Sequence, residues 1–300
     1  MELKNFINQN TLNDIENYLK LHHPPGLIVK GIKGLGIHIA AHYIAAKLLN
    51  CSIEDLNSNP DFYEVTETPI KVEDVDEILE KCNITSLGNH RVVVIQNAET
   101  MSSIAQNRLL KLLEDRASSN ILILCTIKNS LISTVESRCY DIYFHPVEKE
   151  KMVSLLLEQG IEEKYHDFLC FLTEYAPFLI INNLEVINDY IEYYKRLCCI
   201  KERKDMLSLF HCLKEKDENE FFSSHEKYPD FNIRVLLFPF FEMVTSFDEC
   251  RRSSATFPGN LYDFKQAVNV LEQGFLHLSM LQHNYTKNDY FNLLSYLIQV

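Results

Sequence analysis

Short apolar runs alternate with amphipathic stretches over the first half of the chain. The runs are almost continuously hydrophobic, which is typical of strands buried on both faces of a parallel sheet. The amphipathic stretches place apolar residues at helical spacing, as Leu109, Leu112 and Leu113 show. The pattern predicts an α/β domain built from βαβ units. The expected strands are Leu27–Lys30, Phe62–Thr66, Arg91–Gln96, Ile121–Thr126 and Tyr140–Phe144, and the expected helices are Thr11–Leu21, Ile37–Leu49, Val72–Cys82 and Ala105–Glu114.

The pattern changes after His145-Pro146, where strand-like runs give way to helical periodicity alone. This change predicts an all-α second half. We expect a parallel-sheet domain over residues 1–146, a small helical domain over 147–204 and a second helical domain over 205–300. The expected helices are Val147–Gln159, Tyr165–Tyr175, Leu184–Lys201, Lys204–Glu215, Arg234–Phe247, Leu261–His277 and Asn288–Ile298.

Charge and cysteine content narrow the function classes. The 300 residues include 42 acidic and 29 basic ones, for a net charge of −13. Proteins that bind nucleic acid on their own are usually basic, because phosphate neutralisation supplies most of the affinity, so strong independent binding is not expected. The nine cysteines are irregularly spaced and form no C-x-x-C pair, which argues against a zinc site. With no signal-peptide core and no apolar run near the roughly 20 residues that span a bilayer, we expect a cytoplasmic protein without membrane contact.

The segment after the first expected strand has the glycines of a phosphate-binding loop, at Gly31, Gly34 and Gly36. In the motif G-x-x-x-x-G-K-[ST], backbone N–H groups surround the phosphates, the lysine reaches the β- and γ-phosphates, and the hydroxyl ligates Mg²⁺. Here Ile37 replaces the lysine and His38 replaces the Ser or Thr. An aliphatic side chain cannot neutralise phosphate, and imidazole is a poor ligand for a hard cation. We therefore expect no ATP cofactor.

A second nucleotide motif has also lost its charge. In ATPases of this type a strand ends in Asp-Glu, which hold Mg²⁺ and orient the attacking water. The strand that includes Val92–Ile95 ends instead in Gln96-Asn97. Amides hold a divalent cation poorly and cannot act as general bases at neutral pH. Hydrolysis by this chain is not expected.

Four segments occur in a specific order along the first half: Asn59–Tyr63, Val93–Met101, Asn107–Glu114 and Leu131–Cys139, the last ending in Ser-Arg-Cys. In these segments the chain resembles the clamp-loader branch of the AAA+ family, and within it the bacterial DNA polymerase III delta prime subunits. The resemblance covers about residues 20–145 closely and the rest only as a helical pattern.

The resemblance implies a RecA-like AAA+ core, a helical lid and a helical collar that joins the subunits of a clamp loader. It implies that Arg138 acts as an arginine finger, reaching the ATP site of a neighbouring subunit, where such residues are worth ~10³–10⁵ in rate. Ser137 belongs to the same motif, and no His/Asp pair can be placed beside it to make it a nucleophile. The implied role is a stator that does not hydrolyse ATP. The implied partners are gamma/tau-like ATPase subunits and a delta subunit, with the sliding clamp and primed DNA reached through the complex.

The chain also departs from the delta prime pattern. Many of those subunits carry a four-cysteine zinc module after the loop helix, whereas here only Cys51 is present. Ser133 replaces a usual proline, and Asp115-Arg116 replaces a common Glu-Pro. Two alternatives stay open. One is an active AAA+ ATPase in which Lys33 substitutes for the missing lysine, and the other is an AAA+-shaped interaction scaffold in which loss of Arg138 would be harmless.

Overall fold

A computed structural model of the chain describes residues 3–21, 25–115, 119–127, 131–202, 204–205, 229–245, 258–259 and 261–280. The fold divides into two units. The first comprises Met1–Leu155 together with Tyr175–Leu179, and the second comprises Leu156–Glu174 together with Ile180–Val300. The short segment Tyr175–Leu179 thus belongs to the first unit although the chain has already entered the second.

The first unit is built on a five-stranded sheet in the order β2-β3-β4-β1-β5, with every pair of neighbouring strands parallel. All five expected strands are confirmed. In the register, Gly26 at the start of β1 pairs with Leu122 on one side and Cys139 on the other. The strands are β1 (Gly26–Gly31), β2 (Phe62–Val65), β3 (Arg91–Ile95), β4 (Asn120–Thr126) and β5 (Cys139–Phe144).

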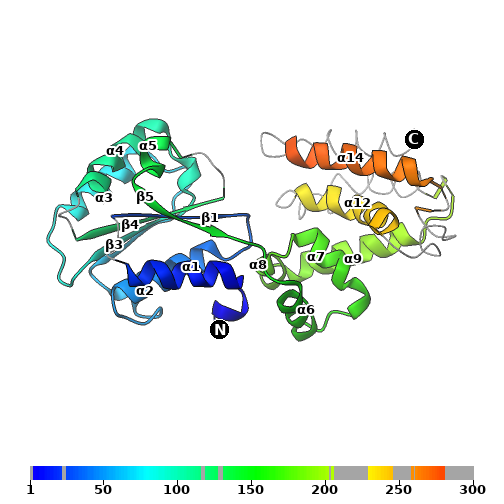
Figure 1. The fold of residues 1–300 in the computed structure, drawn as a ribbon, viewed down its shortest axis with the longest axis horizontal. Helices are drawn as coiled ribbons and strands as arrows, with labels where there is room; N and C mark the ends of the chain where they lie inside the picture. Colours follow the sequence, from blue (N-terminus) through cyan, green and yellow to red (C-terminus); the bar gives the residue numbers. More distant parts are fainter. Residues whose placement is uncertain are drawn as a thin grey trace. The chain divides into compact units, whose positions relative to one another are not determined.

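Helices cover both faces of this sheet (Figure 1). On one face lie α1 (Gln9–Lys20) and α2 (Ile37–Leu48), and on the other lie α3 (Val72–Cys82), α4 (Ser103–Glu114) and α5 (Ser133–Glu136). The second face forms a continuous core in which Leu109 of α4 packs with Leu122 and Leu124 of β4. Alternate strand residues serve the two faces, which is why the strands read as uninterrupted apolar runs. Short 3-10 helices occur at Leu3–Asn5, Leu56–Ser58, Ala98–Thr100 and Glu163–Tyr165.

The second unit is helical over its described residues, which confirms the predicted change of pattern. Its core is aromatic: the Phe168 ring stacks on that of Tyr194 at a centroid separation of 4.4 Å, and Phe238 lies 5.4 Å from Phe168. The chain passes between the units along α6 (Lys149–Glu158) and again along α8 (Pro177–Ile181). The remaining helices are α7 (His166–Thr173), α9 (Leu184–Cys198), α12 (Pro229–Thr245) and α14 (Phe264–Met280).

Some expectations lie outside this comparison. Lys204–Glu215, apart from its first two residues, and all of Asn288–Ile298 fall outside the described residues. The division into domains at residues 146 and 204 stays a prediction. The short helix α8 was not predicted. Among the helices that are described, none has both the length and the apolar character needed to cross a membrane.

Candidate functional site

The glycine-rich loop, residues 31–38, connects β1 to α2 at the carboxyl edge of the sheet. Gly34 and Gly36 have φ values of 88° and 81°, a left-handed conformation that favours glycine. Gly36 is the N-cap of α2, and Ile37 begins the helix with its side chain buried. His38 follows on the exposed side, where partial desolvation and the nearby His42 lower its pKa. The position that would carry a phosphate-binding lysine is therefore part of the apolar core.

The first residues of α8 cover this loop from the outside. The backbone N–H of Phe178 donates a hydrogen bond to the carbonyl oxygen of Gly34 at 3.0 Å. A Cβ atom added to Gly34 would lie 2.3 Å from Cγ of Leu179, and one added to Gly36 would lie 2.4 Å from Cε2 of Phe178. Both apolar side chains are buried. The ring of Phe178 also contacts Phe6, at a centroid distance of 5.8 Å. Two apolar side chains thus occupy the space directly against the glycines of the loop.

At the end of β3, where an active ATPase would carry Asp-Glu, the side chains of this chain form a hydrogen-bond network. The side-chain amide of Gln96 donates to Oε1 of Glu64 at 2.8 Å, and Nε2 of His42 lies 2.7 Å from the same oxygen. Burial raises the pKa of Glu64, but the hydrogen bonds with His42 and Gln96 outweigh this and hold the pKa below its ordinary value. Asn97, in a left-handed conformation, donates to Oγ1 of Thr68 at 3.2 Å. Within the part of the chain that the structure describes, no three His, Cys, Asp or Glu side chains are grouped to hold a metal.

Arg138 lies at the opposite edge of the sheet from the glycine-rich loop. It follows α5 and immediately precedes β5, whose first residue Cys139 pairs with Gly26 at the start of β1. The loop begins where β1 ends, five residues further along, which is about 17 Å at the rise of a β-strand. The guanidinium is exposed and donates from Nη1 to the Thr134 carbonyl at 2.9 Å and from Nη2 to Oε1 of Glu114 at 2.8 Å. The two halves of the predicted site are therefore not brought together within one chain.

Ser137 is part of the same turn. Its hydroxyl donates to the carbonyl oxygen of Thr134 at 3.2 Å, and Nη1 of Arg138 lies 3.5 Å from that hydroxyl. Among the described residues, neither a histidine nor a carboxylate hydrogen-bonds to this hydroxyl, so the geometry there offers no base to activate it as a nucleophile. Ser137 shapes the turn that presents Arg138.

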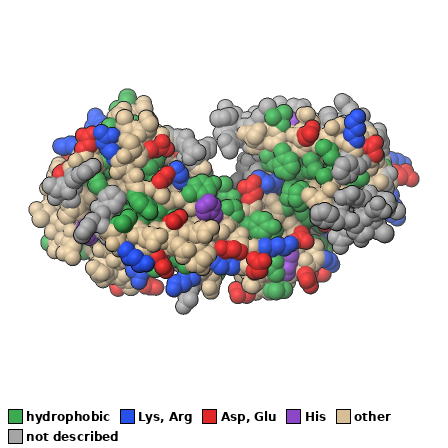
Figure 2. Space-filling view, in the orientation of Figure 1, with side chains coloured by type: hydrophobic (Ala, Val, Ile, Leu, Met, Phe, Trp, Pro, Cys, Tyr) green, Lys and Arg blue, Asp and Glu red, His purple; other side chains and the backbone are tan. Residues whose placement is uncertain are grey.

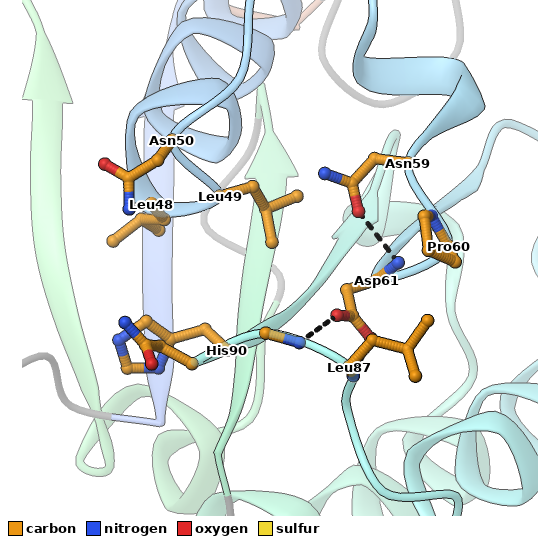
Figure 3. Close-up of a pocket in the computed structure, with 10 residues that line it drawn as sticks. Leu48, Leu49, Asn50, Asn59, Pro60, Asp61, Leu87 and His90 are labelled. Carbon is orange, nitrogen blue, oxygen red and sulfur yellow. Dashed lines mark hydrogen bonds between the residues drawn. The ribbon is translucent and has the colours of Figure 1, made fainter.

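A hollow lies at the amino edge of the sheet (Figure 3). Its volume is about 430 Å³. The end of α2, with Leu48 and Asn50, forms one side, and the turn around Pro60 forms the other, with Leu87 and His90 below. The lining mixes aliphatic side chains with amides and an imidazole. Sequence analysis did not predict this hollow, because nothing in the sequence shows that the segment beginning at Asn59 lies beside the end of α2 and residues 87–90.

A buried ion pair supports the floor of this hollow. Asp61 and Arg91 are 4% and 7% exposed, and Nη2 of Arg91 lies 3.2 Å from Oδ1 of Asp61. The backbone N–H groups of Leu87 and Gly88 donate to the same carboxylate at 3.1 and 2.7 Å. Burial raises the pKa of Asp61, but these backbone hydrogen bonds and the Arg91 guanidinium outweigh that effect and hold the pKa below its ordinary value. The pair fixes the turn before β2 to the start of β3.

Comparison with known proteins relates part of the chain to one family. Residues 7–148 match the family model described as DNA polymerase III, delta subunit. Residues 7–148, just under half of the chain, thus resemble the subunits that this family model describes. The chain is 24% identical over 186 residues to DNA polymerase III subunit delta' of Bacillus subtilis, covering 61% of this chain and 53% of that protein.

Relatives from other clamp-loader systems are similar as well. The chain is 26% identical over 157 residues to Replication factor C subunit 4 of Saccharomyces cerevisiae, covering 50% of this chain and 47% of that protein. The crystal structure of a DNA polymerase III gamma subunit-related protein from Thermotoga maritima aligns with 96% of this chain and 99% of that one, at 15% identity and a TM-score of 0.49. The chain spans about half the length of the curated relatives that it matches.

Proposed function

We propose that this clamp-loader subunit does not hydrolyse ATP and instead supplies Arg138 to the ATP site of a neighbouring subunit. The observation that carries the proposal is the position of Arg138. It is exposed, cationic and roughly a strand length away from the glycine-rich loop of its own chain. A residue so placed cannot reach a phosphate bound at its own loop, but it can reach one held by an adjacent subunit. An arginine finger acting between subunits needs this arrangement.

The state of the glycine-rich loop supports the absence of hydrolysis. Ile37 contributes no positive charge, and Gln96 and Asn97 supply amides where a metal ligand and a water-orienting group are needed. Phe178 and Leu179 add a steric reason, since they lie directly against Gly34 and Gly36. A bound phosphate would have to displace both apolar side chains and then find no lysine. Neither ATP nor a metal ion is part of the proposed mechanism of this chain.

The proposed partners follow from the family. We infer that the chain assembles with clamp-loader ATPase subunits of the gamma/tau type and with a delta-type subunit, and that residues 205–300 carry collar contacts. Figure 2 shows acidic and basic side chains interspersed on the visible face, and the net charge is −13. Such a surface favours contact with the sliding clamp and primed DNA through the assembled complex rather than by this chain alone.

Steady-state ATP turnover of the reconstituted complex tests the proposal. The chain is combined with the ATPase subunits of its own source and stimulated with primed DNA and clamp, and wild type is compared with Arg138→Ala. We expect at least a tenfold drop in turnover with assembly unchanged by gel filtration. Arg108→Ala is the matched control, because Arg108 is similarly exposed and also pairs with a carboxylate, Asp76.

Other outcomes separate the alternatives. Full turnover by Arg138→Ala in an intact complex would overturn the proposal and favour an AAA+-shaped scaffold. ATP binding is measured separately on the isolated chain by calorimetry with Mg-ATP. Saturable binding that is lost in Lys33→Ala would support the ATPase alternative with its substitute lysine, and the absence of binding would refute that alternative.

A further inference from the structure

The side chain of Arg138, although exposed, folds back on its own unit. Nη1 donates to the carbonyl of Thr134, four residues earlier, and Nη2 contacts the carboxylate of Glu114, the last residue of α4. The two ends of the guanidinium fork are therefore engaged inside the chain. An arginine finger uses these same N–H donors to bind the oxygens of a transferring phosphoryl group. Contact with a neighbour's nucleotide thus requires the contact with Glu114 to break.

The packing of α4 in the core sets the position of Glu114. Its neighbour Leu113 is buried in the sheet core, which fixes the rotation of the last turn of α4. On the other side, Val135 anchors α5 in the same core. The buried amide of Gln106 joins the two helices, since its Oε1 accepts a hydrogen bond from the N–H of Ile132 at 2.7 Å. The carboxylate and the guanidinium are thereby held within reach of each other by two anchored helices.

We propose that Glu114 is a restraining partner of Arg138 that sets how readily the finger is released to the neighbouring subunit. This inference rests on the proposed function of Arg138 in trans. The carboxylate restrains the finger in two ways that act in the same direction. It competes with the phosphate for the same donors, and its negative charge partly neutralises the guanidinium that should stabilise charge in the transition state. Glu114 is a positioning residue, because it acts through Arg138 and touches no substrate.

The size of the effect follows from the exposure of the pair. The side chains of Arg138 and Glu114 are 37% and 56% exposed, and ion pairs of this kind are weak and screened by salt. Replacing Glu114 by Gln keeps the length and shape of the side chain and removes its charge. We expect Glu114→Gln to raise turnover by the complex by about two- to fivefold, the range that a surface pair can supply. The change is expected in kcat with KM for ATP unaltered, since the finger acts on the transition state.

The experiment compares DNA-stimulated turnover of reconstituted complexes containing wild type, Glu114→Gln, Arg138→Ala or both substitutions. Glu80→Gln, an exposed residue of α3, is the charge-matched control and is expected to leave turnover unchanged. Two further results are expected. Glu114→Gln has no effect in the Arg138→Ala background, and the advantage of Glu114→Gln shrinks as salt rises from low to high ionic strength. A merely structural role of Glu114 would not depend on Arg138.

The outcomes distinguish this inference from the proposed function. If Arg138→Ala loses turnover but Glu114→Gln behaves as wild type, the restraint is refuted and the arginine finger stands. A decrease in kcat for Glu114→Gln also refutes the restraint, because the carboxylate would then orient the finger for reaction. If Arg138→Ala keeps full turnover, the proposed function fails and the restraint fails with it.

Discussion

The apolar cover of the glycine-rich loop leads to a measurable prediction for stability. Leu179 is 8% exposed and lies against Gly34, whereas Leu87, which lines the hollow at the amino edge of the sheet, is 82% exposed. Both residues belong to the first unit. Truncating a buried leucine to alanine removes its transfer free energy and leaves a cavity, which together cost about 2–5 kcal/mol. The same truncation at an exposed site changes stability by less than about 0.5 kcal/mol. We therefore expect Leu179→Ala to lower the free energy of unfolding by at least about 1.5 kcal/mol more than Leu87→Ala.

Urea unfolding monitored by far-ultraviolet circular dichroism measures this difference, since the chain has no tryptophan to report by fluorescence. With a urea slope of about 1–3 kcal/mol/M, the transition of the first unit should move to lower urea by roughly 1 M. Because two units can unfold in separate transitions, amide hydrogen exchange of peptides spanning residues 31–48 provides a local reading. Equal urea midpoints and equal exchange for Leu179→Ala and Leu87→Ala would refute the packing of α8 on the loop.

Two further predictions follow from backbone geometry and from buried charge. Gly34→Ala should destabilise the chain more than Gly160→Ala in thermal unfolding. Both glycines have positive φ, but a Cβ atom added at Gly160 meets nothing within 4 Å. Equal losses of stability in the two variants would show that backbone strain alone matters. The lowered pKa of Asp61 means that its charged form stabilises the fold above the pKa of the unfolded chain. This contribution is lost as the pH falls through the lower folded pKa, in the region below about pH 4. Asp61→Asn should lower the free energy of unfolding by about 3–5 kcal/mol at neutral pH, because Arg91 is left buried without its anion. The variant should also lose less stability than wild type between pH 7 and pH 3. Urea midpoints measured over this pH range check both results, and an equal loss in acid for the two proteins would contradict the role given to Asp61.

The parallel sheet could be predicted from sequence because its signal is local. Each strand is an apolar run between turn-forming residues, and the bounds of all five strands differ from the expected ones by no more than one residue at either end. The helices before residue 115 were equally readable from their apolar spacing. In the second half, α8 could not be predicted in this way, because it is only five residues long and too short to show a helical repeat.

The site was only partly predictable, for the same physical reason. The substitutions at Ile37 and Gln96 are visible because the motifs that they interrupt are contiguous in sequence. The contact of Leu179 with the loop could not be predicted from the sequence. It joins Leu179 to a glycine 145 positions earlier, and no sequence motif links the two residues. The partner of Arg138 is hidden in the same way, since Glu114 reads as one more exposed acidic residue until the fold places α4 beside α5.

The cover of the glycine-rich loop is part of the same polypeptide, so it behaves as a tethered ligand with a high and constant effective concentration. A free anion can enter only the fraction of molecules in which the cover has moved away. If that movement costs about 2.7 kcal/mol, the open fraction is ~1% and the apparent affinity for any competitor falls about 100-fold. Dilution of the protein does not change this ratio, and only a large excess of competitor could. Under the proposed function, the loop would then not respond to changes in nucleotide concentration, and the subunit would keep one conformation there while its neighbours bind and hydrolyse ATP.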